Sequence, residues 1–488
     1  MVDLAAEDLV VLDEGDEERI VSLSGPPAMS DRTAPVALPP RTFTNRLELR
    51  LPGAAPVTAI LLDALNTPRA DQTYAREQVL GFLRQIPPGV VVSVYTLGRG
   101  LGVLEDFSSD ADALVRKLEE HRGERPAPAE ATPLDIADAG LDPFTSWLEE
   151  TELDLYDHYA KDRALRTVRS LVAIAHHLEQ VPGRKSLVWV SGSFPDWVGR
   201  ASVPLPRRPR AGSQSFSAEI ERAARALSSS SLAIYPVDAR GVRAPTEYDP
   251  AQARIDREMK PADRSGQATM DALAARTGGR AFSHTNDLAG AIGEAARDAR
   301  SAYRLGYEPS HDKWNGKFRR IEVRVRRRGV KLRHRSGYFA QPEEPSEKWY
   351  RVAALDAATW SPVDSTQVGL TVRVTPSADD TLALEIRVRR QDVSLRSLGD
   401  GEQGTLDLWL VQLGEGDAHL GTVSMIADLR LSAAEKERAA LTGDVLLRAR
   451  LRREERAVLL RVLVRDVTTG ALGAVSIPLE RVVTSPTE

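Results

Sequence analysis

The sequence contains no cysteine in its 488 residues. This absence excludes disulfides, thiol nucleophiles, cysteine-ligated zinc sites and iron–sulfur clusters. The eight histidines are scattered along the chain, and no HExxH motif is found. We therefore expect neither a metallohydrolase nor a redox enzyme.

Long hydrophobic runs are missing too. The apolar runs at residues 57–62 and 90–94 are far shorter than the roughly 18 to 20 residues of a membrane helix, so we predict no membrane span. The net charge of -5 excludes a globally basic nucleic-acid-binding protein. A content of 42% hydrophobic and 28% charged residues is typical of folded globular proteins, and roughly 150 residues per domain predicts about three domains.

The first 20 residues lack the basic start and apolar stretch of a secretory signal. They hold eight acidic side chains and one basic side chain, Arg19. Residues 9–12 and 20–23, with a turn at Gly15, are typical of two short strands. A lone hairpin is barely stable in water, so we expect these strands to pair with others further along the chain.

Apolar runs alternate with helical patterns over residues 51–300. The strand-like runs are residues 57–62, 90–97, 186–190 and 232–237. This alternation predicts an α/β domain of the doubly wound, Rossmann-like class, with a mostly parallel sheet.

Ligands of such sheets bind beyond the carboxyl ends of the strands. The segments that leave these ends are residues 63–68, 191–213 and 238–266. The last two are longer than the roughly 12 to 15 residues that unstructured loops usually reach. We therefore expect the functional site at this edge of the sheet.

The pattern changes to simple alternation after residue 300. Residues 321–326 and 330–335, separated by Gly329, are typical of a half-buried antiparallel hairpin. We expect this hairpin and the N-terminal strands to form one small, discontinuous β domain of residues 1–50 plus 301–342, in which the α/β domain is inserted. Residues 343–488 contain repeated strand-like runs and turns, which predict a C-terminal antiparallel β-sandwich.

Several motifs follow one another in an order that resembles a known family. They are ILLDALN, IPPG, PGRKSLVWVSGSF, AIYPVDARGV, TGGRAFSHTNDLAGAI, YRLGYEP and FRRIEVRVRRRGVKLRHRSGY. Over about residues 3–340 the chain resembles the von Willebrand factor A (VWFA)-related bacterial proteins of the acidobacterial type. The resemblance implies a non-enzymatic, protein-binding module of the adhesion type. It also implies a secreted, extracellular or periplasmic protein, and hence a signal peptide encoded upstream of Met1, although a cytoplasmic location stays open.

The resemblance further implies a divalent-ion site, the metal-ion-dependent adhesion site (MIDAS). The family pattern is DxSxS after the first strand, a threonine from a second loop and an aspartate after the fourth strand. Asp63 matches the first position, Leu65 cannot ligate, and Thr67 can. Thr167 is the preferred threonine, and Ser191 stands where the aspartate is expected.

This pattern is degenerate because one hydroxyl and one carboxylate are missing. Hydroxyl and carboxylate oxygens suit Mg²⁺ or Mn²⁺, and with a single carboxylate we expect weak binding at most. Thr132 is a second choice for the threonine. The alternative is that Asp63 caps a helix or accepts hydrogen bonds from loop amides, as aspartates after strands often do.

Four arginines and no acid lie in residues 198–213, which should lie beside Asp63. Arginine binds carboxylates through charge-assisted hydrogen bonds. We therefore expect the edge to capture an acidic segment of a protein partner, unless residues 198–213 are only a solvated loop. The expected partner-binding residues are Asn66, Ser193, Arg200, Arg207, Arg208 and Arg210.

Three further motifs have simpler interpretations. Residues 98–102 read GxGxG but do not lead into a helix, which favours a turn over a nucleotide site. Ser191–Gly192–Ser193 follows a strand, but Trp189 breaks the GxSxG pattern of hydrolases. Residues 317–335 hold ten basic side chains, whose alternation favours a solvated hairpin face over nucleic-acid binding. A hydrolase or nucleotide-binding enzyme and a structural surface protein remain the alternatives.

Overall fold

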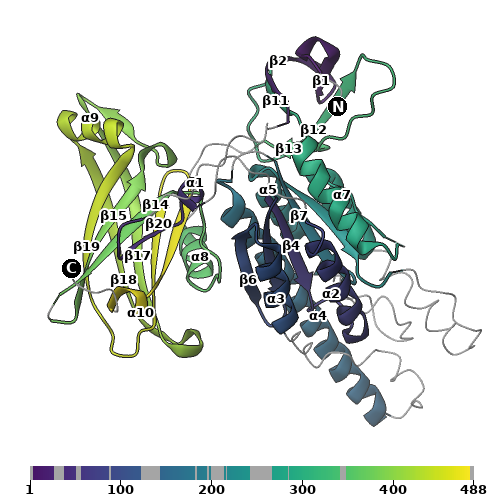
Figure 1. Ribbon diagram of the computed structural model, residues 1–488, viewed down its shortest axis with the longest axis horizontal. Helices are drawn as coiled ribbons and strands as arrows, with labels where there is room; N and C mark the ends of the chain where they lie inside the picture. The colour runs from purple at the N-terminus through teal and green to yellow at the C-terminus, as the bar shows by residue number, and fades with distance from the viewer. Residues whose placement is uncertain are drawn as a thin grey trace, which may run out of the picture.

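We describe the protein from a computed structural model. The structure describes residues 4–26, 38–50, 57–86, 90–121, 143–181, 184–194, 197–198, 214–215, 217–241, 266–283, 285–340, 348–377 and 379–483. The mixed α/β class is confirmed. The structure has a central sheet flanked by helices, a second, antiparallel sheet and two antiparallel sheets in the C-terminal part (Figure 1).

The central sheet has the strand order β10-β7-β4-β5-β6. Its strands are β4 (Val57–Asp63), β5 (Val91–Leu97), β6 (Leu101–Ser108), β7 (Lys185–Ser191) and β10 (Leu232–Asp238). The first four in this order are parallel, and β6 returns antiparallel to β5. Every residue of β5, β7 and β10 is buried, because helices cover both faces of the sheet.

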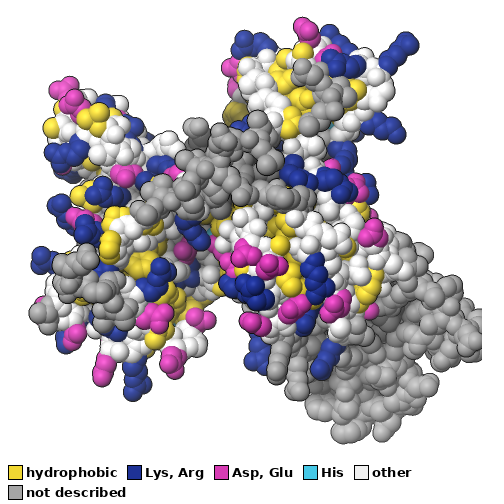
Figure 2. All heavy atoms as spheres, viewed as in Figure 1, with side chains coloured by type: hydrophobic (Ala, Val, Ile, Leu, Met, Phe, Trp, Pro, Cys, Tyr) yellow, Lys and Arg dark blue, Asp and Glu magenta, His cyan; other side chains and the backbone are white. Residues whose placement is uncertain are grey.

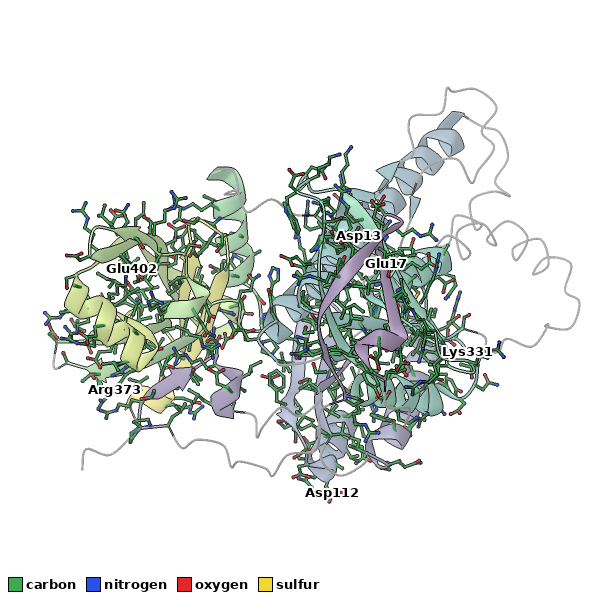
Figure 3. The ribbon with its side chains drawn as sticks, turned by 90° about the horizontal axis from the view of Figure 1, so that it is seen from above. Asp13, Glu17, Asp112, Lys331, Arg373 and Glu402 are labelled. Carbon is green, nitrogen blue, oxygen red and sulfur yellow. The ribbon has the colours of Figure 1, made fainter. Side chains whose placement is uncertain are left out.

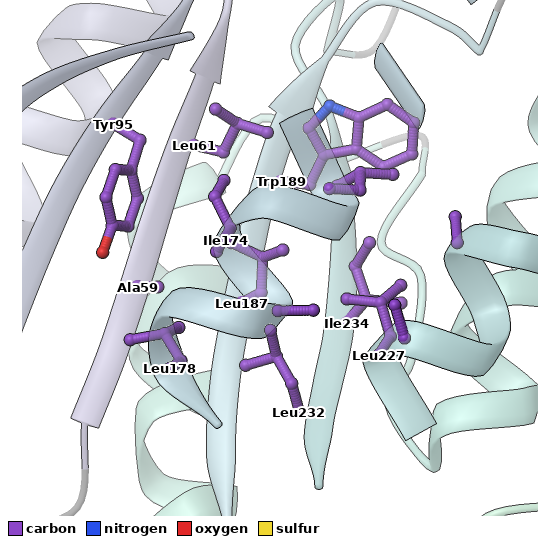
Figure 4. Close-up of a cluster of buried hydrophobic side chains, with 14 of the residues drawn as sticks. Ala59, Leu61, Tyr95, Ile174, Leu178, Leu187, Trp189, Leu227, Leu232 and Ile234 are labelled. Carbon is purple, nitrogen blue, oxygen red and sulfur yellow. The ribbon is translucent and has the colours of Figure 1, made fainter. Parts of the chain in front are cut away.

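Each face of the central sheet has its own hydrophobic core. The helices on one face are α2 (Arg69–Leu83), α3 (Ala111–Glu120) and α7 (Leu288–Ser301). Those on the other face are α4 (Pro143–Leu178), α5 (Ser217–Ser229) and the helical residues 266–277. Leu61, Leu187 and Trp189 of the sheet meet Ile174 of α4 and Leu227 of α5 in this second core (Figure 4).

The N-terminal strands share a sheet with strands that follow the α/β part. Its order is β11-β2-β1-β12-β13, formed by β1 (Leu9–Asp13), β2 (Asp16–Ser24), β11 (Arg304–Glu308), β12 (Phe318–Val325) and β13 (Gly337–Phe339). Asp13 and Glu17 lie on the neighbouring strands β1 and β2 (Figure 3). Asp13 accepts hydrogen bonds from the hydroxyls of Tyr307, at 2.9 Å, and Tyr338, at 2.8 Å. These bonds fasten β1 to β11 and β13.

The predicted hairpin of residues 321–326 with 330–335 is wrong. β12 pairs with β1 and β13 instead, and residues 330–335 form no strand. Arg333 contacts Asp298 of α7 at 2.5 Å, and His334 accepts a hydrogen bond from the backbone of Val323 at 3.2 Å. The alternation of residues 321–326 correctly indicates a strand with one apolar face. It does not indicate the pairing partner, which is the N-terminal strand β1.

Two arginines of this region meet acidic side chains of the N-terminal segment. Arg327 contacts Asp8 at 2.7 Å, and Arg326 lies 3.9 Å from Glu17. Arg324 pairs with Glu322 on its own strand at 2.7 Å. Lys and Arg side chains are also interspersed with acidic ones over the face seen in Figure 2. The basic stretch is therefore partly neutralised within the sheet.

Two antiparallel sheets enclose one core in the C-terminal part. One has the order β19-β15-β14-β3, and the other β16-β17-β20-β21 with β18 also paired to β17. The strands are β3 (Thr42–Thr44), β14 (Leu370–Pro376), β15 (Thr381–Arg389), β16 (Arg396–Leu398), β17 (Gly401–Leu413), β18 (His419–Leu431), β19 (Asp444–Arg452), β20 (Leu459–Asp466) and β21 (Leu472–Pro478). Helices α8 (Lys348–Thr359), α9 (Ala433–Thr442) and α10 (Glu480–Val483) complete this part.

Residues 42–46 contact this C-terminal part rather than the small β sheet, although the expected small β domain ran to residue 50. β3 pairs with β14, Phe43 opposite Val372. The side chain of Asn45 donates to the carbonyls of Ser365 and Val368 and accepts from the backbone of Leu370. These three bonds satisfy a buried amide and hold residues 42–46 on this sheet. Helix α1 (Leu47–Arg50), which follows, also contacts the α/β part: Leu47 is buried in its core, and Arg50 pairs with Asp106 of β6 at 3.3 Å.

The end of α4 joins the α/β part to the C-terminal part. His177 lies with Nδ1 2.6 Å from the carbonyl of Asp364 and Nε2 3.0 Å from the carboxylate of Asp106 on β6. Gln180 donates to the carbonyl of Gln367 at 3.0 Å.

None of the helices in the described part of the chain has the length and apolar character needed to cross a membrane.

Candidate functional site

The carboxyl ends of the parallel strands meet at one edge of the central sheet. β4 ends at Asp63 and β7 at Ser191, and these strands are direct neighbours. Ser191 also pairs with Asp238 at the end of β10. Parallel strands therefore bring Asp63 close to Ser191, which is 128 positions later in the sequence.

Asp63 is the centre of a hydrogen-bond network. Its Oδ1 accepts from the backbone amide of Asn66 at 2.9 Å. Its Oδ2 accepts from Asn66 Nδ2 at 2.8 Å, Trp189 Nε1 at 3.0 Å and Ser191 Oγ at 2.8 Å. The residue is only 2% exposed, so these four donors replace water around the carboxylate.

Burial raises the pKa of Asp63 above its usual value, because the low-dielectric surroundings disfavour the charged form. The hydrogen bonds from Asn66, Ser191 and Trp189 oppose this shift but do not cancel it. In the described part of the chain no lysine or arginine forms an ion pair with this carboxylate. Neutral donors alone stabilise Asp63 there.

Asn66 links Asp63 to helix α4. Its Nδ2 lies 2.8 Å from Thr167 Oγ1, and the Thr167 hydroxyl in turn donates to the carbonyl of Arg163 at 2.8 Å. Since that hydroxyl uses its hydrogen on Arg163, it can only accept from Asn66. The amide nitrogen of Asn66 must therefore face inward, toward both Asp63 and Thr167.

The loop between β4 and α2 is held tightly against the residue after β7. Thr67 Oγ1 accepts a hydrogen bond from the backbone of Gly192 at 3.0 Å. A Cβ added to Gly192 would lie 2.8 Å from the carbonyl oxygen of Asn66, so only glycine fits without a shift. Gln72 of α2 donates to the carbonyls of Ala64 and Thr67, at 3.1 and 2.9 Å. These contacts fix the positions of the side chains around Asp63.

The expected metal ligands Asp63, Thr67, Thr167 and Ser191 all lie at this edge. Three of them, Asp63, Thr167 and Ser191, belong to the network around Asn66 Nδ2. Leu65, at the second motif position, is buried in the hydrophobic core. The second-choice residue Thr132 lies outside the described residues.

The expected partner-binding residues are only partly described. Asn66 and Ser193 are half-buried, and Ser193 Oγ donates to the carbonyl of Phe194 at 3.3 Å. Arg200, Arg207, Arg208 and Arg210 lie outside the described residues. Both ends of that segment are described, in β8 (Trp197–Val198) and β9 (Gln214–Ser215), which pair antiparallel. β8 begins four residues after Ser193 in the sequence.

The arrangement does not fit the divalent ion that the resemblance implies. Mg²⁺ needs oxygen ligands at about 2.0 to 2.1 Å, and the expected oxygens are those of Asp63, Thr67, Thr167 and Ser191. The nitrogen of Asn66 lies between two of them, 2.8 Å from each. No group of three or more histidine, aspartate or glutamate side chains that could hold a metal is found in the described ranges.

The enzyme alternatives gain no support from this geometry. Ser191 is fully buried, and its hydroxyl lies against Asp63 and the carbonyl of Ser193 rather than facing a substrate. Of the GxGxG residues 98–102, residues 98–100 form the turn between the antiparallel strands β5 and β6, and the last two begin β6. A phosphate site of the dinucleotide type requires a strand followed by a helix.

Two contacts of the site were not predicted from the sequence. Trp189 was considered only as a break in the GxSxG pattern, although a fully buried indole N–H requires an acceptor. Asp238, at the end of β10, forms an ion pair with Arg240 at 3.0 Å, next to Ser191. An arginine two residues after a strand-ending aspartate was the available signal.

Comparisons with known proteins give only weak likenesses. No family model matches the chain, and no relative is found among curated proteins. An aerotolerance-related membrane protein from Bacteroides fragilis is 11% identical, with a TM-score of 0.28, over 50% of this chain and 99% of that one. The vWF domain of the pili tip protein Mfa5 from Porphyromonas gingivalis is 11% identical, with a TM-score of 0.26, over 50% and 94%. The ArnB paralog VWA2 from Sulfolobus acidocaldarius is 9% identical, with a TM-score of 0.22, over 97% and 75%. Likenesses of this size carry no argument about function.

Proposed function

We propose that this chain is a non-enzymatic, adhesion-type module that binds a protein partner at the carboxyl edge of the central sheet. The observation that carries the proposal is the closed network around Asp63. Ser191, the candidate nucleophile of this edge, is fully buried and bonded to Asp63. A fully buried serine cannot meet a substrate, so this edge is suited to recognition rather than to nucleophilic chemistry.

The same network makes the edge compatible with an acidic partner. Asp63 is shielded by burial and by four donors, so its charge is kept away from an approaching carboxylate. The arginines of residues 198–213 would supply the attraction, with Asn66 and Ser193 beside them.

The proposed architecture is a VWFA-like domain inserted in a small β domain and followed by a β-sandwich. Pairing of β1 with β12 supports the insertion, because residues 57–301 lie between these strands in the sequence. The two sheets around one C-terminal core support the sandwich. The proposed location, outside the cytoplasm, follows from the family resemblance.

The test is capture of partners from the cell envelope of the source organism by immobilised full-length protein. We compare the wild type with Arg207→Glu/Arg208→Glu and with the control Arg448→Glu/Arg450→Glu, two exposed arginines of β19. We expect the control to retain a purified, captured partner and the first variant to lose it. Equal affinity of all three proteins would contradict binding at this edge.

A further inference from the structure

The Asp63 carboxylate has an unusual position for a charged group. It is almost completely buried at the end of a central strand, and in the described part of the chain no cation pairs with it. Buried charges in proteins are normally paired, or they bind a metal. Some other group must therefore compensate for the lost hydration of Asp63.

Asn66 replaces the lost hydration of Asp63 with two hydrogen bonds. Its backbone N–H and its side-chain amide donate to different oxygens of the same carboxylate. The second hydrogen of the amide is used on Thr167, 2.8 Å away. A single residue thus bridges β4 and α4, as a cation shared between these oxygens would.

We propose that the side-chain amide of Asn66 replaces the divalent ion at this edge, so that the site is complete without metal. The two oxygens nearest the amide nitrogen, Asp63 Oδ2 and Thr167 Oγ1, are those that an ion would need. Each is bonded to other groups as well, to Ser191 and Trp189 in one case and to Arg163 in the other. An ion would have to displace the amide and break this network. The inference deepens the proposed function, but its test does not depend on any partner.

The identity of residue 66 decides the behaviour of the site. An aspartate there has nearly the shape of asparagine, but it replaces a donor by an acceptor beside Asp63. Two carboxylates about 3 Å apart cannot both stay charged without a proton or a cation between them. With the hydroxyls of Thr167 and Ser191, they form the oxygen ligand set that Mg²⁺ and Mn²⁺ prefer. Asn66→Asp should therefore create a metal site.

The experiment measures Mn²⁺ binding to the full-length protein by the loss of the free-ion EPR signal. We expect no bound Mn²⁺ in the wild type and about one equivalent in Asn66→Asp. A second substitution, Thr167→Val, should weaken that binding at least about tenfold, since it removes a ligand. The control is Asn315→Asp, which adds a carboxylate at an exposed position of the small β part and should bind none.

Two results would overturn the proposal. One is stoichiometric Mn²⁺ binding by the wild type that is lost in Thr167→Val. The other is a folded Asn66→Asp protein that binds no metal. If Asn66→Asp does not fold, Asn66→Ser serves in its place. It removes the amide and adds a hydroxyl, so with Asp63 as the single carboxylate it should bind Mn²⁺ weakly but measurably more tightly than the wild type. A folded Asn66→Ser protein that binds Mn²⁺ no better than the wild type would overturn the proposal. Equal partner affinity of the wild type and the arginine variants, together with the expected metal results, would contradict the proposed function alone.

Discussion

The indole nitrogen of Trp189 donates a hydrogen bond to Asp63 across 3.0 Å. Trp189 lies two residues before the end of β7, the strand beside β4, and its ring packs edge-to-face on Phe194. The contact therefore connects the hydrophobic core directly to the polar edge of the sheet. The stability of the fold and the geometry of the site depend on the same side chains.

Replacing Trp189 by phenylalanine tests this connection. Phenylalanine keeps an aromatic ring but removes a buried donor and part of the packed indole volume, so we expect a loss of about 2 to 4 kcal/mol in the free energy of unfolding. The control is Trp360→Phe, since Trp360 is half-exposed and bonds Asp356 at the surface; it should change stability by less than about 0.5 kcal/mol. Urea unfolding measures both. Equal losses would contradict a structural role for the Trp189 bond.

Gly192→Ala should open the site, because the new Cβ would approach the carbonyl oxygen of Asn66 to 2.8 Å. Backbone atoms cannot yield as a flexible side chain does, so we expect a loss of about 1 to 3 kcal/mol in stability and weaker partner capture. Gly81→Ala in helix α2 is the matched control, since its Cβ meets nothing within 4 Å. That change should stabilise the protein by about 0.5 to 1 kcal/mol. Thermal unfolding that ranks the two variants the other way would refute the close approach.

His177 predicts a pH dependence at the contact between the α/β and C-terminal parts. Burial lowers its pKa, but Asp106 and the carbonyl of Asp364 outweigh this effect, so the pKa is raised. Because the pKa of His177 is higher in the folded protein than in the unfolded chain, protonated His177 stabilises the fold. This stabilisation is fully present below the unfolded-state pKa of about 6.5, and it is lost as pH rises through the folded-state pKa. The stability difference between the wild type and His177→Gln should therefore shrink as pH increases from 6.5. Denaturant unfolding at a series of pH values measures it.

The neighbouring histidine provides the control for this prediction. Burial lowers the pKa of His176 to about 4, so its contribution has the opposite sign. As pH falls from about 6.5 toward 4, His176 takes up a proton in the unfolded chain but not in the folded protein. The free energy of unfolding therefore decreases over this range. His176→Gln should remove that loss without changing the profile above pH 6.5. Identical profiles for the two variants would contradict the assigned roles.

Asn45→Ala should loosen β3 from the C-terminal sheet. The substitution removes two donors and one acceptor that satisfy buried backbone groups of residues 365–370, so we expect a loss of about 2 to 4 kcal/mol. Asn315→Ala, at an exposed turn, should have little effect. Limited proteolysis after residue 38 should accelerate in the first variant only. Equal cleavage rates would contradict the pairing of β3 with β14.

Local patterns predicted the central sheet well. The continuous apolar runs that contain Leu61 and Val188 are buried strands because helices cover both faces of the sheet. The meeting of Asp63 with Ser191 also followed from the rule that parallel strands end at one edge. Strand β18 was not recognised, since its small and polar residues, such as Thr422 and Ser424, give little apolar contrast.

Long-range pairing and side-chain geometry could not be predicted. Asn45 bonds residues about 320 positions away, and no local pattern records such a partner. The error at residues 330–335 has the same origin, because alternation reveals an apolar face but not which strand lies beside it. The inward direction of the Asn66 amide depends on Thr167 donating to Arg163, which only coordinates reveal.

The central claim is that the carboxyl edge of the sheet is a closed, amide-bridged network without metal. A high-resolution crystal structure from crystals soaked in Mn²⁺, with an anomalous difference map, tests it most directly. We predict no anomalous peak beside Asp63, and Asn66 Nδ2 within hydrogen-bond distance of both Asp63 and Thr167. A peak within coordination distance of those two oxygens, with the Asn66 amide turned away, would contradict the account.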